Sequence, residues 1–145
     1  MASAKVVAQY MLSLSDPDVG DIISHLKLQK LLYYAQGFHL ALYGSPLFDE
    51  PILAWDHGPV VRSVFDEYRQ YGAGALPVPE DVDFDTLTSD QQELLNEVYT
   101  VYGQYSAWRL RQLTHDEPPW KGATRNGIIS HSAMSEYFKT LLIES

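Results

Sequence analysis

One long helical pattern, from about Ser24 to Gly44, constrains the fold of this chain more than any other feature of its sequence. Six apolar positions repeat along it at spacings of three and four, the period of an α-helix: Leu28, Leu31, Leu32, Ala35, Phe38 and Leu42. Ser24 suits the N-cap, and Gly44 suits the position just beyond the C-terminal end. Because Leu26, Tyr33 and Tyr34 add apolar surface outside this stripe, the pattern predicts a central helix with neighbours on several sides.

Five further helices are predicted, over about residues 4–14, 59–72, 88–103, 106–115 and 130–143. Ser3 suits the N-cap of the first, and Thr88 with Gln91 resembles a capping box. The core face of the helix over 88–103 is expected to consist of Leu94, Leu95, Val98, Val101 and Tyr102. Pro59 suits the first helical position, where its missing N–H costs nothing. The sequence therefore predicts an all-α or nearly all-α fold, a single compact domain covering residues 1–145 with about six helices.

Two segments interrupt the helices. Pro46 and Pro51 exclude a helix interior between residues 45 and 55, so a short extended or hairpin segment is expected near residues 47–55. The stretch 73–87 is rich in Pro, Gly and Asp and predicts a long connection without regular structure.

The chain is acidic, with 19 Asp and Glu against 10 Lys and Arg and a formal net charge of −9. Nucleic-acid binding depends on Lys and Arg that displace counterions from phosphates, so this balance argues against DNA or RNA as a partner. The acids concentrate between Glu80 and Glu97, where seven stand without a single base. This run fits a solvated loop and helix face, or an acidic surface that attracts a basic protein.

Several classes of protein are disfavoured by what the sequence lacks. It has no Cys, which excludes disulfides and thiolate metal sites and fits a reducing compartment. It has neither a signal-peptide pattern at its start nor the roughly 20 consecutive apolar residues of a membrane span. We therefore expect a cytoplasmic protein with no membrane contact.

No motif for catalysis or cofactor binding has both the residue types and the spacing it needs. The five histidines include no HExxH pair, and His115, Asp116 and Glu117 are adjacent, so they point in different directions. There is no GxSxG elbow, and "YGAGALP" lacks the Lys and Ser or Thr of a phosphate loop. The sequence thus predicts no enzyme activity, no metal and no cofactor.

A resemblance to a known family rests on three motifs taken together. They are "LQKLLYYAQG" from Leu28, "WDHGPV" from Trp55 and "LTHDEPPW" from Leu113. In this combination they resemble the Panacea domain, the SocA-like antitoxin family, which includes phage-associated and prophage proteins. The likeness extends from about Met11 to Phe138.

The resemblance implies an antitoxin that neutralises a cognate toxin by direct protein binding, either by occlusion or by delivering it to an ATP-dependent protease. Many antitoxins carry a DNA-binding extension, and none is expected here. The alternative is a phage-type interaction protein on the same fold without a toxin partner. The identity of the toxin and the oligomeric state stay open.

The segments around residues 55–59 and 114–120 have two interpretations. In the structural one, Trp55 anchors an extended segment, Asp56 and His57 bond the start of a helix, and His115 and Trp120 pin an irregular segment. In the functional one, the two segments lie together and form part of the partner surface. The residues of that predicted surface are Trp55, His57, Arg62, His115 and Trp120.

Overall fold

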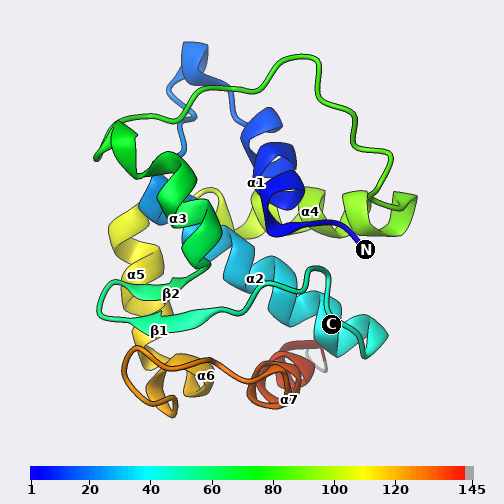
Figure 1. The fold of residues 1–145 in the computed structure, drawn as a ribbon, viewed down its shortest axis with the longest axis vertical. Coiled ribbons are helices and arrows are strands. Elements are labelled where there is room, and N and C mark those ends of the chain that lie inside the picture. The colour runs from blue at the N-terminus through cyan, green and yellow to red at the C-terminus, as the bar shows by residue number, and fades with distance from the viewer. Residues whose placement is uncertain (143–145) are drawn as a thin grey trace.

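Helix α2 (His25–Tyr43) is the axis of the computed structural model, which describes residues 1–142 (Figure 1). Six other α-helices pack around or beside it: α1 (Ala4–Ser13), α3 (Arg62–Tyr68), α4 (Ser89–Tyr102), α5 (Ala107–Asp116), α6 (Pro118–Lys121) and α7 (His131–Leu142). Strands β1 (Leu53–Trp55) and β2 (Gly58–Val60) form a small antiparallel hairpin, and Pro17–Val19 and Arg69–Tyr71 form 3₁₀ turns. The predicted all-α fold is confirmed, with α6 as an additional single turn.

The predicted helix boundaries agree with the structure where local capping sets them. Four N-cap side chains accept a backbone N–H of the first turn: Ser3, Ser24, Thr88 and Ser106. Gln91 completes the capping box with Thr88, and Gly44 ends α2 at φ 72°. The predicted end of the last helix, residue 143, lies outside the described residues.

Most of α2 is buried, as expected for a helix with neighbours on several sides. Leu28, Leu31, Leu32, Tyr33 and Tyr34 are all fully buried. Leu42 is the exception to the predicted stripe, since its side chain is 48% exposed. At that end α2 extends beyond the helices that pack on it. The apolar period of the sequence therefore includes Leu42, although its side chain is only partly covered.

Helix α7 packs closely across α2, and this packing depends on a glycine. A Cβ at Gly37 would overlap the ring of Phe138, which is fully buried and stacks edge-on against Tyr33. The absence of a side chain at position 37 therefore lets the aromatic ring of α7 reach the backbone of α2.

The hairpin lies further along the chain than predicted, and Pro59 belongs to strand β2, not to a helix. Pro59 stands opposite Ala54, whose N–H donates to Gly127 and whose carbonyl accepts from Asn126. Because Ala54 forms its hydrogen bonds on its other side, the missing N–H of Pro59 costs no ladder bond. Helix α3 begins only at Arg62, so Asp56 and His57 do not lie at a helix start.

The connection from residue 73 to 88 contains no helix or strand, as predicted, and arches over α1 (Figure 1). It is tied down by a hydrogen bond from the Leu76 N–H to the Ile23 carbonyl, 2.8 Å, and by the ring of Phe84 against Tyr10. None of the helices within residues 1–142 has the length and apolar character needed to cross a bilayer.

Candidate functional site

The β1–β2 turn and the α5–α6 junction lie together, although more than fifty residues separate them. The His115 Nε2 atom lies 2.7 Å from the Asp56 carbonyl oxygen, and the Trp120 indole N–H donates to the Trp55 carbonyl at 2.8 Å. The rings of His115 and Trp120 are 3.9 Å apart. The two segments singled out in the sequence therefore meet, with side chains of α5 and α6 bonded to the backbone of the turn.

Arginines cover both tryptophans at this junction. The Arg62 guanidinium lies 5.9 Å from the ring centre of Trp55, and that of Arg125 lies 4.0 Å from that of Trp120. Arg125 also approaches the Asp56 carboxylate at 3.7 Å. These are cation–π contacts and an exposed ion pair, each of about 1 kcal/mol or less.

The structure brings four of the five predicted surface residues into this contact network: Trp55, Arg62, His115 and Trp120. We call these four residues, together with His57, the turn surface. His57 is the fifth and is exposed at the tip of the turn, where it helps to lower the pKa of His25. His115 lies in α5, within the helix predicted over residues 106–115, whereas the prediction that Trp120 lies in an irregular segment is wrong, since it belongs to α6. Two prolines, Pro118 and Pro119, permit the break between these helices and start the second one.

Lys30 lies beneath the turn and is only 1% exposed. Gly58 has φ +115°, and a Cβ there would lie 2.8 Å from the Lys30 Cε atom and 3.1 Å from the Thr114 hydroxyl. Burial, with a smaller effect of the Arg111 charge, lowers the pKa of Lys30 to about 7. No carboxylate within residues 1–142 forms an ion pair with it.

Two neighbouring side chains of α2 also hold buried polar atoms without a partner among the described residues. They are the Nδ1 atom of His25 and the Nε2 atom of Gln29. Gln29 uses its oxygen instead, which accepts from the Val61 N–H at 2.8 Å and holds the start of α3 against α2. Burial also lowers the pKa of His25, and the nearby Lys30 adds to that effect.

Glu117 is the centre of a second polar cluster, at the junction of α5 and α6. Its two carboxylate oxygens accept from the hydroxyls of Tyr33 and Tyr34, each at 2.9 Å. Burial raises the pKa of this carboxyl to about 7, although hydrogen bonds from Tyr33, Tyr34 and Tyr137 favour its charged form. The carboxylate in turn raises the pKa of Tyr33 and Tyr34, after burial.

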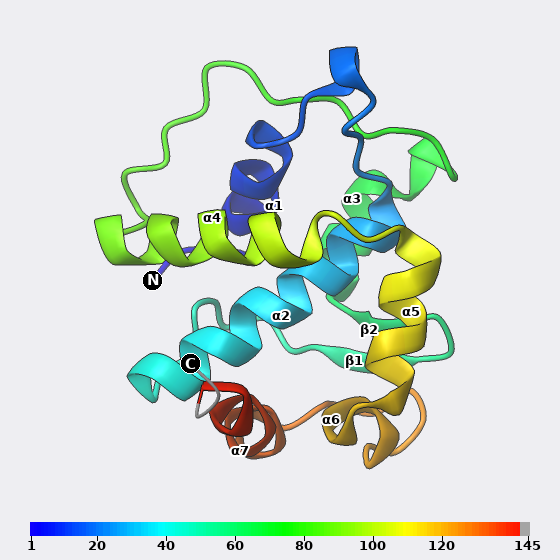
Figure 2. The same cartoon turned by 180° about the vertical axis from the view of Figure 1, so that it is seen from behind.

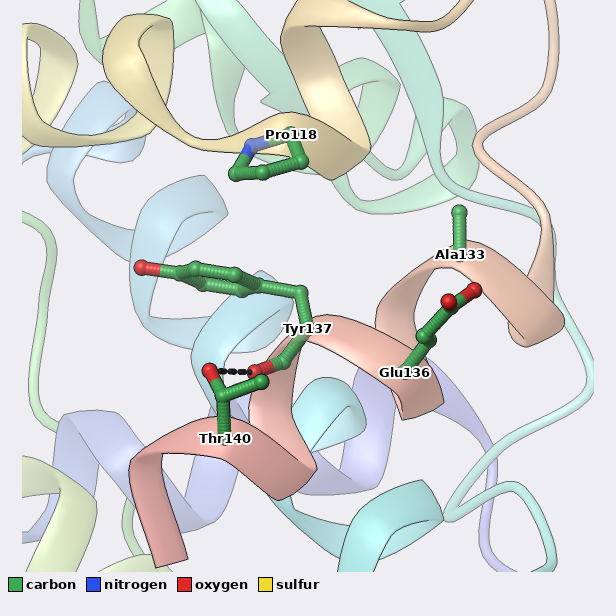
Figure 3. Close-up of a pocket in the computed structure, with 5 residues that line it drawn as sticks. All are labelled: Pro118, Ala133, Glu136, Tyr137 and Thr140. Atoms are coloured by element: carbon green, nitrogen blue, oxygen red, sulfur yellow. Dashed lines mark hydrogen bonds between the residues drawn. The ribbon is translucent and has the colours of Figure 1, made fainter. Parts of the chain in front are cut away.

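Tyr137 connects this cluster to the surface of α7. Its ring lies under Pro118, and its hydroxyl points away from Glu136 and Ala133 (Figure 3). The hollow beside it is open and has a volume of about 350 Å³. Burial, and then the nearby Glu117 carboxylate, raise the pKa of Tyr137 to about 12.

The polar groups at the α5–α6 junction are engaged within the protein. Both ring nitrogens of His115 contact backbone carbonyl oxygens, and Asp116 is exposed. Among residues 1–142 no group of three or more His, Asp or Glu side chains could hold a metal ion. The arrangement is suited to joining α2, the hairpin and α5 into one rigid unit.

Sequence reasoning missed Lys30 and Glu117, although both stand inside the quoted motifs. It also missed an apolar groove between α2, α4 and α7, because Leu42 and Val101 were assigned to the core. Val101 is 49% exposed. No signal in the sequence distinguishes Glu117 from an exposed acid, because its neighbours are His115, Asp116 and Pro118.

Comparison with known proteins agrees with the family resemblance of these motifs. A family model described as antitoxin SocA-like, Panacea domain, matches residues 28–121, which is more than half of the chain. The matched segment begins at the first motif of α2 and ends just after Trp120, so it contains Lys30, Gln29 and Glu117 but neither His25 nor Tyr137. No curated protein and no solved structure matches the chain. The chain belongs to the family of SocA-like antitoxins that carry the Panacea domain.

Proposed function

We propose that this protein is an antitoxin that neutralises a cognate toxin by binding it directly. Membership of the SocA-like antitoxin family carries the proposal. The polar clusters fit it, because the Lys30 amine packs beneath Gly58, the Glu117 carboxylate accepts from two tyrosine hydroxyls, and the His115 ring contacts backbone carbonyl oxygens. We infer a binding protein without enzymatic activity.

The turn surface is our candidate for part of the toxin contact. Its exposed groups, above all His57 and Arg62, stand on a scaffold fixed by the hydrogen bonds of His115 and Trp120. Exposed side chains on a rigid frame bind with little loss of conformational freedom. The remaining acidic surface would meet a basic toxin with complementary charge and speed their association.

A co-expression growth assay tests the proposal. Each small protein encoded beside this gene is induced with and without it, and we expect one neighbour to arrest growth and this protein to restore it. If no neighbour is toxic, the phage-type interaction protein becomes the better explanation. The rate of association with the toxin should fall strongly with salt, and a rate independent of salt would refute the electrostatic part.

A further inference from the structure

The apolar groove is lined by the C-terminal part of α2 together with α4 and α7. That end of α2 lies away from the β1–β2 hairpin (Figure 2). The groove has a volume of about 410 Å³, and its walls come from three helices. The lining residues that carry the argument, which define the groove below, are Phe38, Leu42, Val98, Val101, Tyr102 and Leu141. Most of its surface is therefore hydrocarbon, as in sites that bind an apolar side of another molecule.

Two aliphatic side chains that line the groove are partly exposed to solvent. Leu42 is 48% exposed and Val101 is 49% exposed, and they come from different helices, α2 and α4. Tyr43, also 48% exposed, adjoins Leu42 at the rim. Single exposed apolar residues are ordinary, but a hollow with several of them marks an interaction surface.

The rim of the groove is acidic. Glu97 lines the groove itself, and Glu93 and Asp90 lie about one and two turns earlier on α4, beside Leu42. None of these three carboxylates forms an ion pair within residues 1–142, and no Lys or Arg of that range lines the groove. An apolar channel with unpaired acids along one side attracts a ligand that is apolar on one face and basic beside it.

We propose that the groove binds an amphipathic helix of the toxin, with its apolar stripe between α2, α4 and α7 and its Lys or Arg residues along Asp90, Glu93 and Glu97. A helix laid in a groove uses anchors at i, i+3 or i+4 and i+7, which suits a channel walled by helices. The inference rests on the proposed function, because it takes the toxin as the partner.

Charge separates this occupant from two others. A second copy of this chain would bring the same acids of α4 to the groove, so like charges would face each other. An anionic membrane would be repelled by the same carboxylates. A basic helix alone satisfies both the apolar walls and the acidic rim.

The first test uses a synthetic probe and the full chain. An 18-residue helical peptide, with Leu along one face and Lys on both sides of it, is titrated by fluorescence anisotropy at low salt. We expect Leu42→Gln and Val101→Gln to weaken binding at least tenfold, since they remove apolar surface without changing charge. Val19→Gln is the matched control, because Val19 is 76% exposed but lies in the 3₁₀ turn after α1.

The second test isolates the acidic rim. The double variant Glu93→Lys, Glu97→Lys should weaken binding of the peptide more than tenfold. Its control is Asp18→Lys, Glu80→Lys, which changes the net charge equally at exposed positions on other segments. Equal losses in the two variants would show that net charge matters and not the rim, and would overturn the inference.

Other results would also overturn it. These are a wild-type chain that does not bind the peptide, groove variants that bind it like wild type, and a dimer or vesicle binding that Val101→Gln abolishes. Thermal unfolding followed by circular dichroism verifies that each variant folds.

The growth assay distinguishes this inference from the proposed function. If the protein restores growth and the Leu42→Gln, Val101→Gln variant restores it equally, the groove is not the toxin contact and neutralisation stands. If no neighbouring protein is neutralised while the peptide still binds in the groove, neutralisation is overturned and the groove remains a site for a basic helix.

Discussion

The two ends of α2 differ in the kind of side chain that is buried there and the kind that is exposed. Near its N-terminal end, α2 carries the buried amine of Lys30. A little further along, the hydroxyls of its Tyr33 and Tyr34 donate to the carboxylate of Glu117, which comes from the α5–α6 junction. At the C-terminal end the protein leaves Leu42 and Val101 half exposed around a groove. One end thus buries polar groups, and the other exposes apolar ones.

The contrast also separates the turn motifs from the groove. Gln29, His115 and Trp120, which stand in the motifs, hydrogen-bond the backbone of the turn and of the start of α3. Leu42, Val101 and Glu97 stand outside the three motifs, although they lie within the residues that the family model matches. The turn surface and the groove are thus two separate candidate contacts, which separate substitutions can test.

The largest expected effect concerns the buried amine. Lys30→Met should stabilise the protein at pH 7 by about 4 kcal/mol, because it removes the cost of burying an ammonium group. A lysine whose folded-state pKa, about 7, lies below its unfolded value binds fewer protons when folded. Wild-type stability should therefore rise as the pH rises above 7, and Lys30→Met should lose most of that rise.

Urea unfolding at pH 7, 8 and 9 provides the measurement. The control is Lys121→Met, because Lys121 is exposed and its replacement should change stability by less than about 0.5 kcal/mol. A Lys30→Met protein less stable than wild type at pH 7 would mean that the amine has a partner that offsets its burial.

The next effect tests the close approach of the turn. Gly58→Ala should destabilise the protein by about 3 kcal/mol, since φ +115° is strained for any residue with a Cβ and that Cβ would press on Lys30. Gly44→Ala is the control, as Gly44 has φ 72° but nothing within 4 Å of the added atom. We expect Gly44→Ala to lower the free energy of unfolding by about 1 kcal/mol. Equal losses in the two variants would show that contact of the added Cβ with Lys30 contributes nothing.

The buried carboxyl should give a smaller effect with the opposite dependence on pH. Because burial raises the folded-state pKa of Glu117 from 4.5 to about 7, the folded state holds the proton over that range while the unfolded state releases it. The contribution of Glu117 to stability should thus fall by about 2 kcal/mol between pH 4.5 and 7.

Glu117→Gln should remove that fall, measured by thermal unfolding across the same range. Burial lowers the pKa of His25 and His39, which works against the fall below pH 6.5, so the comparison is between variant and wild type. A variant with an unchanged slope would show that the carboxyl stays ionised among its tyrosines.

The smallest expected effect is at the groove. Leu42→Ser should change the free energy of unfolding by less than about 1 kcal/mol, against about 3 kcal/mol for Leu32→Ala on the same helix. The physical reason is burial, because Leu32 is fully buried and Leu42 is half exposed. Chemical denaturation of the two variants checks it, and a large loss at Leu42 would assign that residue to the core.

The sequence predicted what local interactions decide. Caps such as Ser24 and Thr88 satisfy N–H groups three residues away, so the helix starts could be predicted without knowing the fold. Leu42 and Val101 were misassigned because periodicity identifies an apolar stripe but not how far along it a neighbour reaches. Pro59 was misplaced because its strand pairing depends on Ala54, which bonds to residues 126 and 127.

The polar clusters could not be predicted either, because the residues that form them are far apart in the sequence. Glu117 meets Tyr33 and Tyr34 across more than eighty residues, and no spacing rule connects them. The meeting of Trp55 with Trp120 was anticipated only as one of two alternatives, and the structure supports the contact. Whether the turn surface binds a partner stays a prediction.

The contact of Gly37 with Phe138 also limits how this chain can evolve. Since any side chain at position 37 would occupy the volume of the ring, the first step away from glycine is harmful unless position 138 has already become smaller. A smaller residue at 138, in turn, leaves a cavity against Tyr33 that selection would disfavour. The two positions are therefore expected to change together in descendants of this sequence, or not at all.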